Sequence, residues 1–395
     1  MSALSELMSA QALRSTVALQ PIDGSGGRVF PPTYPLSSEE ERKAGPRDQK
    51  FRHVVEHTET ELRVLIDSVA SQANRQEAAL VSARIADRIK FADIYVDLSA
   101  TASGFQRLSA TEMPHRLSDA ILRDSEIDGT PFGKSAIGKR ILNATSDDLS
   151  ALIEASPTSL VFGCWFSQHG LARQFRIQRS TTSEIWADGA ILGKAVSSRI
   201  DPIGIEKINL YEDAAGDWTA FKSKAVLNKG KPKSHKTDRP SEINHGNIAP
   251  NIRDQGITAR SITLRWALPL AAVRRLRFGG GDRDAAGQAY VAALAIAARV
   301  LDHDQGYSLR SRCDLISNGP VTIEIIAKDG SISSLPISDD GAIALLAEAE
   351  AGMMRADIAI HGTVVAKPSQ KLIDLIKANY EQQLAKGDDR EGASE

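Results

Sequence analysis

The chain has 395 residues, of which 42% are hydrophobic and 25% charged, and its net charge is −2. This composition predicts a globular protein with a hydrophobic core and excludes a protein that binds nucleic acid through bulk positive charge. The two cysteines, Cys164 and Cys313, form no CxxC pair, so neither a disulfide framework nor a thiolate zinc site is expected. We expect no membrane span and no secretory signal peptide, and therefore a cytoplasmic protein.

Strands and helices interleave along the first half of the chain. We expect a strand over residues 12–22, closed by the turn sequence DGSGG, and a long helix over residues 59–89 with an apolar stripe at helical spacing. The apolar run SLVFGCWFS (159–167) predicts a buried strand, and further extended chain follows in FRIQRSTTSEIWA.

The second half continues the pattern. It predicts strands at SITLRWALPL and VTIEIIAKDG, with the buried helix AAGQAYVAALAIAARVL between them, and two later helices at AIALLAEAEAGM and QKLIDLIKANYEQQL. The order predicts an α+β fold with an antiparallel or mixed sheet and helices on one face, which is the ferredoxin-like pattern with large insertions.

Basic residues concentrate in two places. Arg173, Arg176 and Arg179 follow the apolar run, with no acid before Glu184. Arginine suits phosphate contact because its planar fork donates several hydrogen bonds and stays charged. A basic surface hairpin paired with acids of a neighbour is the alternative.

The second basic place is residues 221–240, where seven cations face one acid, Asp238. Gly230 and Pro232 predict a loop or long hairpin arm, because no apolar periodicity exists beyond Asn228. We expect this arm to be mobile in the free protein and to contact RNA through Lys229, Lys231, Lys233 and Lys236. A solvated loop without a partner is the alternative.

Two further patterns carry polar chemistry. On the long helix, hydroxyl, amide and guanidinium groups share one face, which is formed by Ser68, Ser71, Gln72 and Arg75. Such a face suits contact with the phosphates and sugars of a nucleic acid. The alternative is an ordinary solvated helix surface. On a helix, HVVEH (53–57) would place His53 and His57 on one face as metal ligands, with Glu56 as general base. The alternative is a solvated helix start that happens to carry these polar residues.

Several long segments resemble one family. They are LIDSVASQANRQE, RLSATEMPHRLSDAILRDSEIDGTPFGKSAIG, SLVFGCWFSQHGLARQFRIQRSTTSEI, SSRIDPIGI and INHGNIAP, in family order. The chain is similar to the repeated backbone subunit of type I CRISPR surveillance (Cascade) complexes, subtype I-G (formerly I-U). The resemblance covers most of the chain and is weakest before Thr58 and after about Ala366.

The resemblance implies a modified RNA-recognition fold of the RAMP superfamily. It implies one domain over 10–366 with a basic thumb-like insertion at 205–258, and a C-terminal helix and tail at 367–395. Copies would stack with other Cascade subunits along the crRNA, hold its spacer by the sugar–phosphate backbone and leave its bases to pair with target DNA. The subunit would not be an enzyme and would need no cofactor or metal.

The same resemblance extends the predicted RNA contacts. Beside the arginine cluster, the lysines and the helix face, it adds Asn74, Arg107, His115, Arg116, Ser197, Ser198 and Arg199. The alternative function is an enzyme. It would be either a RAMP endoribonuclease, whose loop aspartate the sequence does not locate, or a metal-dependent hydrolase built on the HVVEH residues.

Overall fold

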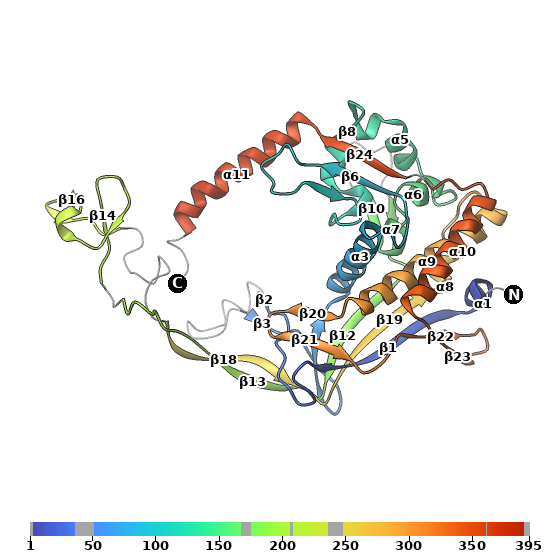
Figure 1. The fold of residues 1–395 in the computed structure, drawn as a ribbon, viewed down its shortest axis with the longest axis horizontal. Helices are drawn as coiled ribbons and strands as arrows, with labels where there is room; N and C mark the ends of the chain where they lie inside the picture. Colours follow the sequence, from blue (N-terminus) through green and yellow to red (C-terminus); the bar gives the residue numbers. More distant parts are fainter. Residues whose placement is uncertain are drawn as a thin grey trace. The chain divides into compact units, whose positions relative to one another are not determined.

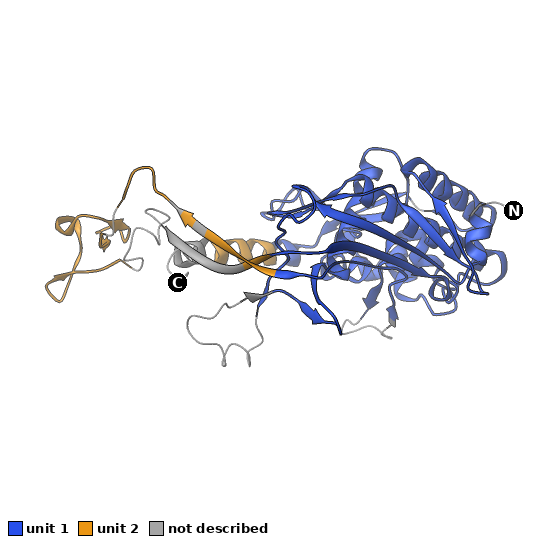
Figure 2. Ribbon diagram, turned by 90° about the horizontal axis from the view of Figure 1, so that it is seen from below, with its two compact units in different colours: residues 1–191, 257–373 blue, residues 192–256, 374–395 orange. Residues whose placement is uncertain are grey.

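The computed structural model describes residues 3–35, 51–166, 175–205, 208–235, 248–360 and 362–390. The chain divides into two compact units, coloured separately in Figure 2. Unit 1 consists of Met1–Ile191 and Ile257–Ile373, and unit 2 of Leu192–Gly256 and Asp374–Glu395. The insertion expected at 205–258 overlaps unit 2 over residues 205–256.

A nine-stranded sheet forms the centre of unit 1 (Figure 1). Its four middle strands are, in spatial order, β21 (Cys313–Ser317), β1 (Ala12–Pro21), β19 (Ser261–Pro269) and β12 (Thr182–Asp188). Every neighbouring pair among them is antiparallel.

Two long helices complete this core. Helix α3 (Val69–Ile85) lies between β1 and β12 in the chain, and α9 (Gly281–Asp304) lies between β19 and β21. The resulting β-α-β-β-α-β order, with the first strand central, is ferredoxin-like. The predicted α+β class is therefore confirmed.

The remaining strands of this sheet extend its edges. β5 (Leu62–Asp67) and β4 (Val55–His57) continue it beyond β12, β20 (Tyr307–Arg310) borders β21, and β22 (Thr322–Ile326) pairs with β1 and β23 (Ile332–Pro336). Along β1 the side chains alternate, so that Leu13, Val17 and Leu19 are buried while Arg14 and Thr16 are exposed. One face of the sheet thus packs into the core, as the period of two requires.

Helices cover that core face. Contacts join α9 to α3, to α10 (Asp339–Arg355) and to β19. By length and composition α9 could cross a membrane, contrary to the expectation that no run would qualify, but 78% of its apolar window is buried. It is apolar all round because protein surrounds it, which is typical of a core helix.

A second, five-stranded sheet also belongs to unit 1. Its order is β7 (Arg107–Ser109), β6 (Asp93–Asp97), β24 (Thr363–Pro368), β8 (Ser125–Ile127) and β9 (Thr130–Pro131). Short helices accompany it: α4 (Ala120–Arg123), α5 (Ala136–Leu142), α6 (Ser150–Ala155) and α7 (Thr158–Val161). α1 (Ala3–Ser9) and α8 (Leu270–Val273) belong to the same unit.

Two sequence predictions were wrong in part. The helix expected from residue 59 begins only at Val69, because Leu62–Asp67 forms β5, whose β-branched Val64 and Ile66 are buried in the sheet. Ser68 then caps α3, its hydroxyl accepting from Ser71 N at 3.3 Å. The strand expected over 159–167 is instead the end of α7 followed by β10 (Cys164–Phe166).

Unit 2 is built from two-stranded ribbons. β13 (Ile191–Arg199) pairs with β18 (Ile248–Thr258), and two small hairpins lie between them in the chain: β14 (Tyr211–Glu212) with β15 (Trp218–Thr219), and β16 (Leu227–Asn228) with β17 (Lys231–Pro232). Most of helix α11 (Gln370–Arg390) also falls in this unit.

Candidate nucleic-acid interface

Four of the predicted RNA-binding residues line one cavity in unit 1. They are His115, Arg116, Arg176 and Arg179. The cavity has a volume of about 180 Å³ and lies between a short helical turn at Arg116–Ser118 and the hairpin of β10 with β11 (Phe175–Ile177). Residues from three separate segments of the chain therefore meet at one place.

The hairpin presents an aromatic ring and a cation side by side. Trp165 lies directly opposite Arg176 in the strand register, and the guanidinium carbon of Arg176 lies 5.9 Å from the centre of the indole. Trp165 is 56% exposed and Arg176 is also exposed. Their neighbours Cys164 and Phe166 point inward and are buried, so the strand anchors itself on one face and displays Trp165 on the other.

Gly163 allows the wall of the cavity to close. Its φ is +83°, a conformation that other residues rarely adopt. A Cβ at this position would lie 2.9 Å from the backbone nitrogen of Arg179 and 3.0 Å from the carbonyl oxygen of Ile177. Only glycine lets these two backbone segments approach so closely, and this approach places Arg179 in the cavity lining.

Arg116 braces the cavity from inside. It is 9% exposed; its Nη1 donates to the carbonyl of Gly163 at 2.9 Å, and its Nε and Nη2 both bind the carboxylate of Glu77, Nη2 at 3.1 Å. Burial raises the pKa of Glu77 to about 6, although Arg116 acts to lower it. All three nitrogens of the guanidinium have protein partners, so Arg116 holds the cavity wall together, and its contact with RNA stays a prediction.

Arg176 and Arg179, the other arginines of the cavity, form no close ion pair within the described residues, although Glu77 attracts Arg179 electrostatically. Desolvation, together with the nearby Arg116, lowers the pKa of Arg179, which nevertheless stays charged because a guanidinium is not deprotonated in proteins. The site can therefore bind an anion.

Cys164, also in the lining, is no nucleophile. Burial raises the pKa of its thiol to about 12, so the reactive thiolate is not formed near neutral pH.

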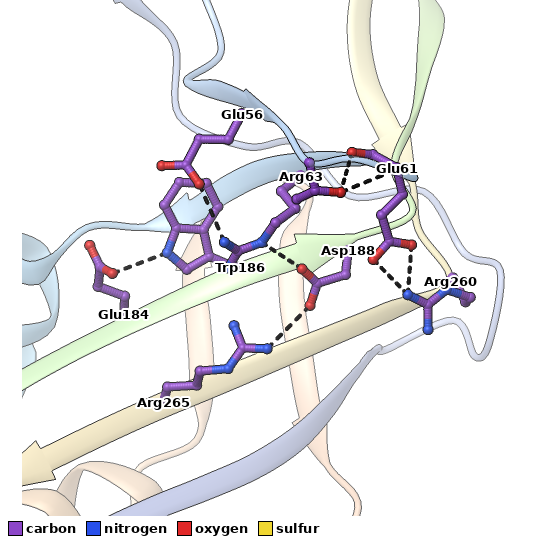
Figure 3. A network of polar contacts seen from close by, with 9 residues as sticks. Glu56, Glu61, Arg63, Glu184, Trp186, Asp188, Arg260 and Arg265 are labelled. Atoms are coloured by element: carbon purple, nitrogen blue, oxygen red, sulfur yellow. Dashed lines mark hydrogen bonds and ion pairs between the residues drawn. The ribbon is translucent and has the colours of Figure 1, made fainter.

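Several arginines elsewhere on unit 1 are paired with acids, as Figure 3 shows for the network around Asp188 and Glu61. Asp188 accepts from Arg63 at 2.7 Å and lies 3.5 Å from Arg265. Arg260 pairs with Glu61 at 2.6 Å. The cation of Arg63 also lies 4.6 Å from the ring of Trp186, whose indole donates to Glu184 at 3.1 Å.

The polar face expected on α3 points inward. Gln72 is fully buried, donates to Asp67 at 2.8 Å and accepts from Ser183 at 2.9 Å. Arg75 donates to the same Asp67 at 2.9 Å and to the carbonyl of Leu309 at 2.8 Å. These contacts tie the helix to the core through both residues, and their contact with RNA stays a prediction.

The rest of that face is divided. Ser68 caps the helix and Ser71 is half-buried. Asn74, which the family resemblance added outside that face, is exposed.

Of the other predicted contacts in unit 1, Arg107 is exposed on β7, with its guanidinium carbon 5.5 Å from the ring of Tyr95. Arg173 lies outside the described residues.

In unit 2, Ser198 is exposed on β13, whereas the side chains of Ser197 and Arg199 lie outside the description. Lys229 and Lys231 are exposed at the turn and second strand of the β16–β17 hairpin. Lys233 pairs with Glu212 at 2.6 Å, an acid that the local sequence did not indicate. Lys236 lies outside the described residues.

The predicted metal site required a helix over residues 53–57, and the structure has no helix there. Residues Phe51–Arg52 and Val55–His57 are strands, so His53 and His57 share no helical face. Glu56 pairs with Arg63 at 3.3 Å, and His53 Nδ1 lies 2.9 Å from the carbonyl oxygen of Pro32. Within the described ranges, no group of three or more His, Cys, Asp and Glu side chains could hold a metal ion.

Sequence reasoning missed Trp165 and Gly163. Trp165 belongs to an apolar run that indicates burial, and only its alternation with Cys164 and Phe166 signals an outward position. Gly163 follows three apolar residues and lies between α7 and β10, so the glycine itself was the signal that the chain changes there from helix to strand.

Comparison with known proteins gives one family match. Residues 13–191 match the family model described as CRISPR-associated protein GSU0053. No curated protein matches the chain.

Chains of solved structures also match, 39 in all, and they include a chain of the structure titled "CRISPR RNA-guided surveillance complex, pre-nicking", at 11% identity. The match covers 94% of this chain and 99% of the other with a TM-score of 0.33, which is too low for an argument to rest on it. The residues matched by the family model include most of β1, all of α3 and the lining of the cavity.

Proposed function

We propose that the chain is a non-catalytic backbone subunit of a type I CRISPR effector complex and binds the sugar–phosphate backbone of the crRNA. The observation that carries the proposal is the cavity lined by Arg176 and Arg179, which form no ion pair within the described residues and lie inside the region that matches a CRISPR-associated family. Arginine forks in a partly desolvated wall favour phosphate oxygens over water.

The lysine hairpin of unit 2 provides a second basic surface. Lys229 and Lys231 are exposed there, and flexible cations gain affinity for a polyanion by releasing its counterions. Copies of the subunit would line up along one guide with other subunits of the complex, and the bases left free would pair with target DNA in antiviral defence. Subtype I-G and the RAMP superfamily, which the sequence resemblance implies, belong to this proposal.

The two arginines provide the test. Replacing Arg176 and Arg179 with alanine in the full chain should weaken binding to single-stranded RNA about equally for all sequences, because phosphates carry no sequence information. The slope of log K against log salt should fall by about 0.7 for each phosphate that the variant no longer neutralises. Arg260→Ala with Arg265→Ala is the matched control, since both arginines are paired on the sheet edge.

The outcomes are distinct. An unchanged salt slope after the double substitution, or an equal loss of affinity in the control, would contradict the proposed interface. Cleavage of guide or target RNA by the purified chain, free of other subunits, would instead support the alternative of an endoribonuclease.

A further inference from the structure

Trp165 is a large aromatic side chain that the fold holds out of the core. It is 56% exposed, the highest value among the four tryptophans, since Trp186 and Trp266 are at 7% and 1% and Trp218 of unit 2 is at 42%. Its position is fixed, because the residues on either side in β10 are buried at 6% and 1%. The ring is therefore displayed on a rigid strand rather than left on a flexible loop.

The surroundings of the ring are cationic. Arg176 faces it across the hairpin, near the outer limit for a cation–π contact, and so leaves much of the indole open. Arg179 and the exposed His115 line the cavity that Trp165 borders. A ligand that uses both features must carry a flat aromatic surface and a negative charge close together.

We propose that Trp165 and Arg176 form a stacking platform for one unpaired base of a single-stranded RNA, while the adjoining phosphate lies at Arg179. This inference rests on the proposed function and adds a base contact to what would otherwise be pure backbone binding. An unpaired base is required, because bases within a duplex are already covered on both faces. The platform accepts any base, since every base has a π-face.

The geometry favours a nucleotide over a protein segment. An aromatic or proline side chain of a partner protein could cover the indole, but it would bring no anion to Arg176 and Arg179, neither of which forms an ion pair within the described residues. A nucleotide supplies both the ring and the charge.

The test compares Trp165→Ala, Trp165→Phe and wild type in binding to a fluorescein-labelled single-stranded RNA. The control is Tyr380→Ala, an aromatic residue 46% exposed on α11. Stacking on an aromatic side chain contributes about 1–3 kcal/mol per base, so Trp165→Ala should weaken binding by about 5- to 150-fold. Trp165→Phe should retain most of the affinity, and the salt slope should not change, because no charge is removed.

A second probe isolates the base. An abasic oligonucleotide with the same backbone should bind wild type and Trp165→Ala equally. An equal loss of affinity for RNA and for the abasic strand would overturn the platform, as would wild-type affinity in Trp165→Ala.

The failures can be told apart. The double variant Arg176→Ala, Arg179→Ala could lose RNA binding while Trp165→Ala keeps it. This result would contradict the stacking platform but would still support the proposed function. If the wild-type chain binds neither strand, alone or with the other subunits of its complex, the proposed function itself fails. Thermal unfolding of each variant, with an unchanged midpoint expected, verifies that the hairpin is folded.

Discussion

The buried pair of Arg116 and Glu77 should control both the stability of unit 1 and its dependence on pH. Arg116→Met removes the bonds to Glu77 and Gly163 and leaves a buried carboxylate without its countercharge. Breaking a buried pair on one side typically costs about 3–5 kcal/mol in free energy of unfolding. For about 300 residues the unfolding entropy is about 0.6 kcal/mol/K, so the midpoint should fall by about 5–8 °C.

The sign of the pH effect follows from the direction of the shift. The folded-state pKa of Glu77, at about 6, exceeds its ordinary value, so the folded state favours the protonated carboxyl. The stability that this group contributes is present below about pH 4.5 and is lost as the pH rises through about 6. Without Arg116 the pKa rises further, and the cost of Arg116→Met should be larger at about pH 8 than at about pH 5.

The assay is thermal unfolding of wild type and variants at both pH values. Adding Glu77→Gln to Arg116→Met should restore part of the stability at about pH 8, because no buried charge remains. Arg260→Met is the matched control; its side chain is 65% exposed, so its pair with Glu61 is screened by solvent and should contribute little to stability. Equal costs for the two single substitutions, or a cost of Arg116→Met independent of pH, would refute the reasoning.

Three further outcomes are expected. Asp67→Asn should destabilise unit 1 by about 3 kcal/mol in denaturant titrations, because the fully buried carboxylate accepts from Gln72, Arg75 and Arg310; an effect below about 1 kcal/mol would contradict this. Gly163→Ala should destabilise by about 1–2 kcal/mol or more and weaken RNA binding together, whereas Gly319→Ala, with open space around it, should do neither. Lys229→Ala with Lys231→Ala should leave the unfolding midpoint unchanged but flatten the salt dependence of RNA binding, and an unchanged slope would remove the hairpin from the interface.

The sequence was most informative where one periodicity dominates. The alternation of β1 and β19 predicts those strands to within one residue of their ends, and the apolar run of α9 predicts its core, although the helix extends four residues before and three residues beyond that run. It failed at residues 59–67, where apolar spacing fits both a helix and a buried strand, and only pairing with β12 and β4 decides between them. Local pattern carries no information about such distant partners.

The candidate site likewise has features that the local sequence reveals and features that depend on distant partners. That Arg176 and Arg179 lack local acids can be read from the sequence, and neither forms an ion pair within the described residues of the fold. The inward direction of Gln72 and Arg75 could not be read, because their partners Asp67, Ser183 and Leu309 come from three other strands. The local sequence likewise shows no partner for Arg116, because its partner Glu77 lies 39 positions away in the chain.

The central claim is that this chain holds a guide RNA as one of several copies in a CRISPR effector complex. The most direct measurement is to express it with its partner subunits and a CRISPR array, purify the particle, and determine its RNA content and subunit mass by native mass spectrometry. The account predicts one discrete small RNA and several copies of this chain in the particle. The double variant that combines Arg176→Ala and Arg179→Ala should yield neither the RNA nor the multiple copies. A chain that stays a monomer and never co-elutes with RNA under these conditions would contradict it.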